Sequence, residues 1–319
     1  MQRAIPVGED AVAAADVALG MKDAQLLSDS SRAALSTARD QTEDAARTAT
    51  RLVSRPLPEL GRKPVWFWEL YGVSSRLEKD LPVVKKTTQS VEASSAALRR
   101  ATEAVDAAGT AAATAAGALA ADLESTNRPA PNSAVLELRS VAESLAATSH
   151  FDGDTAQSLR TYETAVQTLR SGHAATLAAE AGPLQGARAE IEDFARGLAP
   201  GVLLDFEWAD LVNDLGGANG YLSGETVWPV DDGKYSTIRL SNSVAEDWPG
   251  DSSKALVAHE VGHAITVKCR GMYDTTDSKT VEAWATAWAI SMGFTDEGNG
   301  TQAYGAPPES LIAQAAGCR

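Results

Sequence analysis

Apolar residues recur at helical spacing through most of the first 200 residues. Sparse leucines and valines stand three, four or seven positions apart, as in Val91, Leu98 and Val105, and Ala, Ser and Thr fill the positions between them. This periodicity, with its breaks at Pro and Gly, predicts helices over residues 8–54, 81–126, 133–148 and 154–198, the last interrupted near residue 182. Long helices with such thin apolar faces predict an elongated antiparallel bundle or coiled-coil-like stalk.

Two segments stand out within this helical region. Residues 107–118 consist only of Ala, Thr and Gly, so neighbouring helices could approach closely there. Residues 65–71 read Val-Trp-Phe-Trp-Glu-Leu-Tyr and contain four aromatic side chains. Such a cluster could be a patch for a protein partner or a membrane surface, but we favour a hydrophobic plug that closes one end of the bundle.

The pattern changes after Pro200-Gly201. Two β-type segments, 226–229 and 235–240, flank the sequence Val-Asp-Asp-Gly at 230–233, and its Asp-Gly pair favours a hairpin turn. Five of the seven tryptophans also lie beyond residue 200. We therefore expect a mainly α-helical protein with two domains, a helical bundle or stalk over residues 1–200 and a small α+β domain over residues 201–319.

One motif in the second part carries chemistry. Residues 255–266 form an apolar-periodic run behind an Asp-Ser-Ser helix start and contain the pattern H-E-x-x-H. Histidines four positions apart on a helix share a face, so His259 and His263 could bind one metal ion. A zinc ion lowers the pKa of a water to about 7, and Glu260 is placed to take its proton. Gly262, inside this helix, predicts the close approach of another backbone.

A catalytic zinc site needs a third protein ligand. A further histidine six residues after His263 is excluded, because Cys269 occupies that position and no histidine follows it. A ligand on the C-terminal side is then a carboxylate. The candidates are Asp274, Asp277, Glu282, Asp296 and Glu297. Glu282 is favoured, because it lies in an Ala-rich helix, expected from about Asp277 to Gly293, that could pack tightly on the motif helix.

These two segments, HEVGHAIT and TVEAWATAWA, resemble the gluzincin type of zinc metallopeptidase. The resemblance covers about residues 235–293 and implies a zincin-like fold. It implies that His259, His263 and Glu282 bind Zn²⁺, with Glu260 as general base and then general acid. Many gluzincins carry an Asp four residues after the ligand Glu to support a histidine, and here that position is Thr286.

The resemblance also implies an edge strand above the motif helix that pairs with a peptide or protein substrate. The segment that includes Thr237, Ile238, Arg239 and Leu240 precedes the helix and is the expected strand. Peptide hydrolysis further needs a donor for the developing oxyanion. The candidate donors are Tyr273, Tyr304 and Arg270, none of them clearly favoured.

Charge and cysteine content indicate which partners and which cellular compartment to expect. The net charge of −15 argues against a nucleic-acid partner. Cys269 and Cys318 are expected to form a disulfide, which favours an extracytoplasmic location over a cytoplasmic one. Residues 1–6 lack the apolar region of a signal peptide and no stretch of about 20 apolar residues is evident. We therefore expect no membrane span here, although an anchor could lie upstream.

Two functions of different classes fit these observations. The first is a zinc-dependent peptidase in which Glu260 drives the attack of water on the peptide bond. The second is an extracytoplasmic helical adaptor or scaffold, whose helices bind a protein partner and whose zinc-binding domain is catalytically idle. The intact set of ligands and base favours the peptidase.

Overall fold

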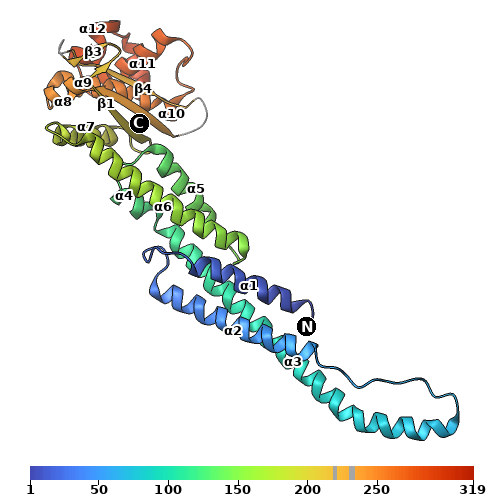
Figure 1. Ribbon diagram of the computed structural model, residues 1–319. Helices are drawn as coiled ribbons and strands as arrows, with labels where there is room; N and C mark the ends of the chain where they lie inside the picture. Colours follow the sequence, from blue (N-terminus) through green and yellow to red (C-terminus); the bar gives the residue numbers. More distant parts are fainter. Residues whose placement is uncertain (218–220, 230–233) are drawn as a thin grey trace. The chain divides into compact units, whose positions relative to one another are not determined.

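The computed structural model describes residues 1–217, 221–229 and 234–319, and the chain is mainly helical with a small α+β part at its C-terminal end (Figure 1). Its contacts divide it into two compact units. The first comprises residues 1–126 and 137–168, and the second comprises residues 127–136 and 169–319. The second unit therefore includes helical segments that precede residue 200. That residues 201–319 fold as a domain of their own stays a prediction.

The first unit is built around α1 (Ala4–Leu19), α2 (Asp29–Val53) and α3 (Phe67–Ala118). The prediction of one helix over residues 8–54 was wrong, because the chain leaves the helix at Gly20 and α2 starts anew at Asp29. Ser28 caps α2, since its hydroxyl accepts a hydrogen bond from the Ser31 backbone N–H at 3.2 Å. Leu98 of α3 is fully buried and packs with Ala46 and Ala49 of α2.

Small residues allow α3 to pack closely within this unit, as predicted for residues 107–118. A Cβ atom at Gly117 would lie 2.9 Å from the Ala142 carbonyl oxygen. A Cβ atom at Gly109 would overlap the Phe151 ring, with a closest approach of 2.1 Å. Both positions therefore depend on the absence of a side chain.

The N-terminal half of α3 lies outside this packing. The helix begins at Phe67 rather than near residue 81, and it continues through Pro82. Leu98 and Val105 are buried, whereas Leu77 and Val84 at the same seven-residue spacing are exposed. The aromatic residues of segment 65–71 are exposed as well, so the prediction of a hydrophobic plug was wrong.

By length and composition, one stretch of the described residues could cross a membrane. It runs over Phe67–Thr126, its best window has a mean hydropathy of 1.2, and 33% of that window is buried. We had expected no such stretch. It is weak support for a span, because core helices of soluble proteins reach the same length and composition.

The remaining helices before the sheet lie close to the predicted ranges, except that the helix expected over residues 81–126 is interrupted at Leu119. They are α4 (Ala120–Thr126), α5 (Asn132–Ala146), α6 (Gly153–Glu180) and α7 (Gln185–Leu198). The break between α6 and α7 falls at Gly182-Pro183, as expected. In α7, Ile191 and Ala195 are buried in the same hydrophobic core as the helix that carries the motif.

The second unit contains a three-stranded sheet with the order β1-β5-β4. β1 (Leu203–Ala209) runs parallel to β5 (Tyr235–Ser241), and β4 (Gly224–Val227) pairs antiparallel with β5. The predicted hairpin pairing of the two segments is thus confirmed, while its turn at Val230–Gly233 lies outside the described residues. β2 (Leu211–Val212) and β3 (Leu215–Gly216) form a separate two-stranded ribbon.

Helices follow this sheet in the sequence. They are α8 (Asn242–Asp247), α9 (Asp251–Ala264), α10 (Thr266–Cys269), α11 (Ser278–Ser291), the 3₁₀ turn η2 (Glu297–Asn299), α12 (Thr301–Tyr304) and α13 (Glu309–Ala315). Helix α9 packs directly against β4 and β5. Phe206 and Ile238 of the sheet share one core with Val261 of α9 and with Trp284 and Trp288 of α11. Because both tryptophans are fully buried, truncating either to Ala should cost about 3–5 kcal/mol.

The chain end is tied to this core. Cys269 and Cys318 form the expected disulfide across 49 residues. The Trp288 indole N–H also donates to the Cys318 carbonyl oxygen at 2.9 Å. A disulfide is typical of oxidising compartments and gives limited support to an extracytoplasmic location.

The contact between α9 and α11 depends on Gly262. A Cβ atom there would lie 2.8 Å from the Ala285 carbonyl oxygen and 2.9 Å from its Cα. This confirms the close backbone approach that the glycine predicts.

We predict that Gly262→Ala lowers the free energy of unfolding by about 1–3 kcal/mol, because the added methyl group must push α11 away. Gly197→Ala is the control, since no atom of α11 or any neighbour lies near a Cβ at that helical position, and it should change stability by less than about 1 kcal/mol. Urea unfolding followed by tryptophan fluorescence measures both. Equal effects of the two substitutions would contradict the close contact.

Candidate metal centre

Helix α9 places the two histidines and the glutamate of the motif. It begins at Asp251, as expected, and its residues from Val257 to Ala264 are buried between the sheet and α11. His259, Glu260 and His263 are 4–6% exposed. Buried polar side chains need partners, and those of the two histidines lie on α11 and on the segment that follows it.

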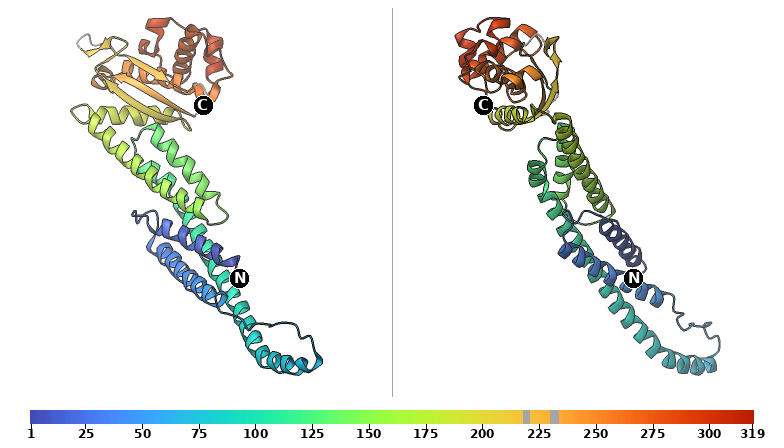
Figure 2. Two further views of the ribbon diagram at one scale, coloured as in Figure 1. Left: turned by 45° about the vertical axis from the view of Figure 1, so that its right-hand side comes forward. Right: turned by 60° about the vertical axis from the view of Figure 1, so that its left-hand side comes forward.

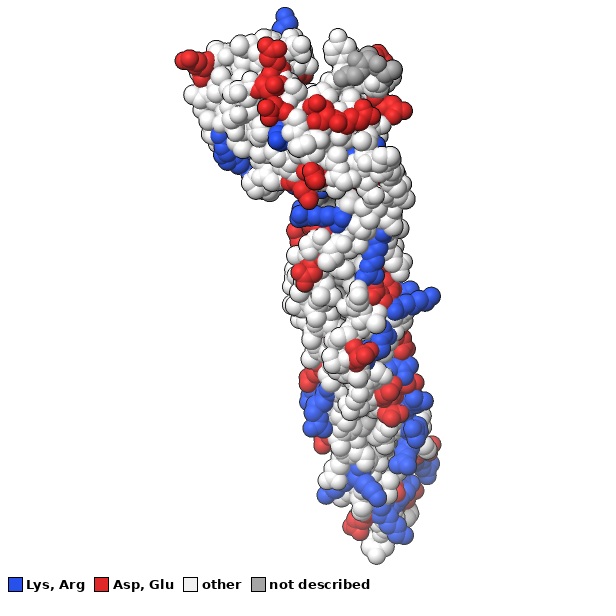
Figure 3. Space-filling view, turned by 90° about the vertical axis from the view of Figure 1, so that its left-hand side faces the viewer, with Lys and Arg blue, Asp and Glu red and all other residues white. Residues whose placement is uncertain are grey.

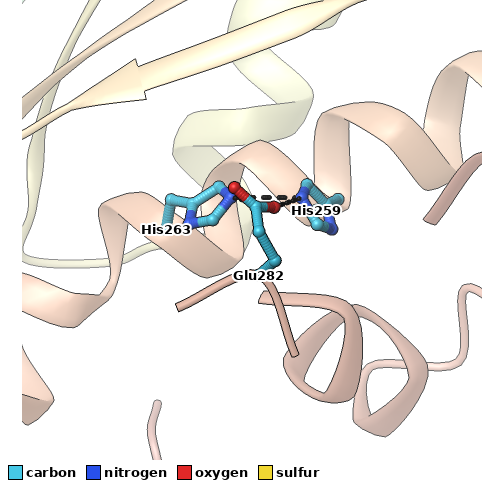
Figure 4. Close-up of side chains that lie close together, drawn as sticks. All are labelled: His259, His263 and Glu282. Atoms are coloured by element: carbon cyan, nitrogen blue, oxygen red, sulfur yellow. Dashed lines mark hydrogen bonds and ion pairs between the residues drawn. The ribbon is translucent and has the colours of Figure 1, made fainter. Parts of the chain in front are cut away.

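Glu282 reaches the histidines from α11. Asp277 caps this helix by accepting from the Thr280 N–H at 3.0 Å, and Gly293 follows it with a φ of 95°, as the sequence predicted. The Glu282 carboxylate lies 3.2 Å from Nε2 of His259 and 3.3 Å from Nε2 of His263, and the two Nε2 atoms are 3.1 Å apart (Figure 4). The three predicted ligands therefore converge, and they form a group that could hold a metal ion.

The spacing of these atoms fits a tetrahedral ion. Bonds of about 2.0–2.1 Å at tetrahedral angles place neighbouring ligand atoms about 3.3 Å apart. The three observed separations, 3.1–3.3 Å, match this value. One ion could thus bind all three side chains with little movement.

A backbone carbonyl orients His259. Its Nδ1 lies 2.8 Å from the Asn299 carbonyl oxygen, which favours a proton on Nδ1 and leaves the Nε2 lone pair for a metal. Asn299 is held by its own amide group, which donates to the Phe294 carbonyl oxygen at 2.9 Å. Gly300, with a φ of 97°, lets this segment pass close to the imidazole, since a Cβ there would lie 2.8 Å from His259.

Sequence reasoning did not find this partner. The position where gluzincins carry Asp holds Thr286, whose hydroxyl is 3.4 Å from His259 Nδ1. The hydrogen-bond partner of His259 Nδ1 is instead the backbone carbonyl group of Asn299. Because every residue has such a group, no residue type in the sequence identifies this partner. The only local signal was the Asn-Gly pair that makes the turn.

His263 is supported differently. Its Nδ1 is buried and has no hydrogen-bond partner among the described residues. The Trp228 ring stacks on its imidazole with a centroid distance of 5.8 Å. On its Nδ1 side this ring is therefore held by packing, whereas its Nε2 atom faces Glu282 at 3.3 Å.

The local charges favour a cation where the three ligand atoms meet. Burial raises the pKa of the Glu282 carboxyl, but hydrogen bonds to His259 and His263 outweigh it and leave the pKa well below its usual range. Burial lowers the pKa of His259, whereas its hydrogen bond to Glu282 and the charges of Glu260 and Glu282 leave it raised. The pocket thus keeps its carboxylate ionised and attracts positive charge.

Glu260 is held by β4. The Thr226 hydroxyl lies 2.7 Å from the Glu260 carboxylate and 3.0 Å from its backbone carbonyl oxygen. A Cβ at Gly224 would lie 2.6 Å from the same carboxylate, so only glycine allows the strand to come so close. The edge strand and the motif helix are therefore in direct contact at Glu260.

A cleft opens beside the three ligands. Its inner part, about 240 Å³, is lined by His259, Glu260, His263, Glu282 and Tyr304 together with residues of β4. A neighbouring cavity of about 650 Å³ shares Gly224, His259, Glu260 and Tyr304 with it. The cleft is thus large enough to admit several residues of an extended chain.

The expected substrate strand needs a correction. Thr237, Ile238, Arg239 and Leu240 lie in β5, which pairs with β1 on one side and β4 on the other. Its backbone groups are already bonded, so it cannot pair with a substrate. Among the described residues, β4 is the strand at the edge of the sheet nearest the cleft.

The other candidate carboxylates have different partners. Asp274 accepts from the Thr276 N–H, and Asp277 caps α11. Asp296 caps the turn η2 and accepts from the Ser252 hydroxyl at 2.8 Å. Glu297 lines the outer cavity, and neither it nor these aspartates belongs to the ligand group.

The three candidate oxyanion donors are now distinguished by position. The Tyr273 hydroxyl bonds to Thr266 at 2.6 Å and its ring stacks on Trp284. Arg270 donates to the Pro229 carbonyl oxygen. Tyr304 lines the cleft, and its ring stacks on His259 with a centroid distance of 5.9 Å.

We predict that the full chain binds one divalent zinc ion and that His263→Ala or Glu282→Ala weakens this binding at least about tenfold, because each removes one of three ligands. Asp274→Ala is the control, because it removes a nearby carboxylate outside the group. Titration calorimetry with Zn²⁺ measures all four proteins. Loss of binding in the control but not in Glu282→Ala would show that the third ligand is wrong.

Comparison with known proteins does not assign the chain to a family. No family model, no curated protein and no solved structure matches it. Its function is therefore inferred from the arrangement of its own residues.

Proposed function

We propose that this protein is a zinc-dependent peptidase of the gluzincin type, with a zincin-like C-terminal part. The observation that carries the proposal is the convergence of His259, His263 and Glu282 at ligand spacing, at the base of a cleft that Glu260 also lines. Two histidines and one glutamate are the ligand set of several zinc peptidases, and three protein ligands leave a tetrahedral position open. When bound, the ion would activate a water and polarise the peptide carbonyl.

Glu260 supplies the proton transfers. Its carboxylate accepts a proton as water attacks the carbonyl carbon, and the same proton then passes to the leaving amine. The Thr226 hydroxyl fixes the direction of this carboxylate through its 2.7 Å contact. A group that must serve as base and then as acid benefits from being held in one position.

The edge of β4 supports a peptide rather than a small molecule as substrate. An extended peptide could add to this edge by backbone hydrogen bonds and so pass along α9. The strand contacts Glu260 through Gly224 and Thr226. A bound peptide would therefore have its backbone close to the base.

Tyr304 is the best placed of the candidate oxyanion donors. Burial raises the pKa of its phenol to about 12, and the charges of Glu282 and Glu260 act in the same direction. The hydroxyl therefore keeps its proton at neutral pH and can donate it to a developing negative charge.

We expect Glu260→Gln to keep the metal and to lower kcat for peptide hydrolysis by about 10²–10⁴-fold, because glutamine cannot accept the proton. Glu297→Gln is the matched control in the same cleft and should retain activity. Cleavage of a mixed peptide library, with metal content measured alongside, checks both. Undiminished turnover by Glu260→Gln would show that Glu260 is not the general base. A wild-type protein that holds zinc but cleaves no peptide would favour the idle scaffold.

For Tyr304→Phe we expect a fall in kcat of about 10²–10³-fold with little change in KM, because the hydroxyl acts on the transition state. Tyr273→Phe removes the competing phenol and should leave kcat within about threefold of the wild type. Steady-state kinetics on one cleaved peptide distinguishes the two. The reverse ranking would transfer the role to Tyr273.

A further inference from the structure

The largest group of exposed apolar side chains in the described chain lies far in sequence from the metal centre. It comprises Leu57, Leu60, Val65, Trp66, Phe67, Trp68, Leu70 and Tyr71, here called the aromatic tip. Each of these side chains is between 55% and 82% exposed. Single exposed apolar residues need no explanation, but a contiguous group with four aromatic rings marks an interaction surface.

The aromatic tip has a defined local structure. The Trp66 and Trp68 rings stack at 5.2 Å, and Phe67 packs edge-on against Trp68 at 5.1 Å. Glu69 accepts hydrogen bonds from the backbone N–H groups of Val65 and Trp66, at 2.8 and 3.2 Å. These contacts satisfy two backbone N–H groups just before α3, so the rings can enter an apolar medium without leaving those two groups unpaired.

Two polar contacts join the loop that precedes α3 to this helix. Arg76 donates to the Leu60 carbonyl oxygen at 2.8 Å, and Arg62 lies 3.6 Å from Glu69. Within the first unit, this loop and the start of α3 project beyond the ends of α1 and α2 (Figure 2). The exposed apolar side chains therefore belong to a projecting end of the unit.

The charge around the aromatic tip is opposite to that of the whole chain. Residues 51–86 contain eight Lys and Arg against four Asp and Glu, a net of +4, whereas the chain carries −15. Figure 3 shows Lys and Arg side chains over this end of the unit, with Asp and Glu side chains among them. Positive charge beside exposed Trp, Phe and Tyr is the pattern of segments that bind the interface of an anionic bilayer.

We propose that the aromatic tip binds the surface of anionic phospholipid membranes. The aromatic rings insert at the level of the headgroups, where Trp and Tyr are favoured, and the neighbouring cations contact lipid phosphates. A projecting, cationic end fits this ligand better than it fits a second copy of the chain, since that copy would bring the same positive charge. The role is independent of the proposed peptidase activity and would place the enzyme at a membrane surface.

The test uses the full chain and phosphatidylcholine vesicles with and without phosphatidylglycerol. We expect co-sedimentation with the anionic vesicles, and a loss of at least about tenfold in the partition coefficient for the Trp66→Ala/Phe67→Ala/Trp68→Ala variant. Val7→Ala/Val17→Ala is the control, because it removes exposed apolar groups from α1 of the same unit. Circular dichroism verifies that each variant keeps its helices.

A second pair of variants tests the charge. Arg62→Glu/Lys63→Glu should weaken binding to anionic vesicles at least about tenfold, and salt should weaken the wild type in the same direction. Arg99→Glu/Arg100→Glu carries the same change in charge at an exposed site on α3 away from the tip and should bind nearly as the wild type does.

Three results would overturn the proposal. The first is that the wild-type protein does not bind anionic vesicles. The second is that the triple variant binds them as tightly as the wild type does. The third is a concentration-dependent dimer, seen by ultracentrifugation and abolished by the triple substitution, in a protein without vesicle binding. The last result would identify the tip as an interface between two copies.

Discussion

The candidate metal centre depends on how closely two helices approach each other. Helix α9 carries two imidazoles and α11 carries one carboxylate, and their atoms come within 3.1–3.3 Å because Gly262 has no side chain to separate the backbones. The fully buried Trp284 and Trp288 anchor α11 in the same core, and Trp288 also donates to the carbonyl oxygen of Cys318, which is disulfide-bonded to Cys269. Ligand geometry here is therefore a consequence of core packing, which is rigid because interiors are densely packed.

The elements that could be predicted are those whose signal is local. H-E-x-x-H encodes its own geometry, because any helix brings positions i and i+4 to one face. Glu282 could be selected because the alanines of its helix predict tight packing on the motif helix. The cap at Asp277 and the break at Gly182-Pro183 follow from backbone chemistry. The disulfide required only that two cysteines be present in one small unit.

The remaining features depend on tertiary contacts that leave no residue signature. The partner of His259 is a carbonyl group that any residue at position 299 could offer, and the edge of the sheet is set by strand order, which placed β4 rather than β5 outermost. Apolar periodicity indicates that one face of a helix is suited to burial, but it does not show whether another element packs against that face. The heptad positions of α3 are therefore buried at Leu98 and exposed at Leu77, and the aromatic segment 65–71 is exposed rather than buried.

The proposed activity requires that three side chains from two helices hold one zinc ion. A crystal structure of the zinc-soaked protein, with anomalous data collected on both sides of the zinc absorption edge, would locate that ion. We expect one anomalous peak about 2.0–2.2 Å from Nε2 of His259, from Nε2 of His263 and from a Glu282 carboxylate oxygen. A peak elsewhere, or none at this position in crystals that contain zinc, would contradict the proposal.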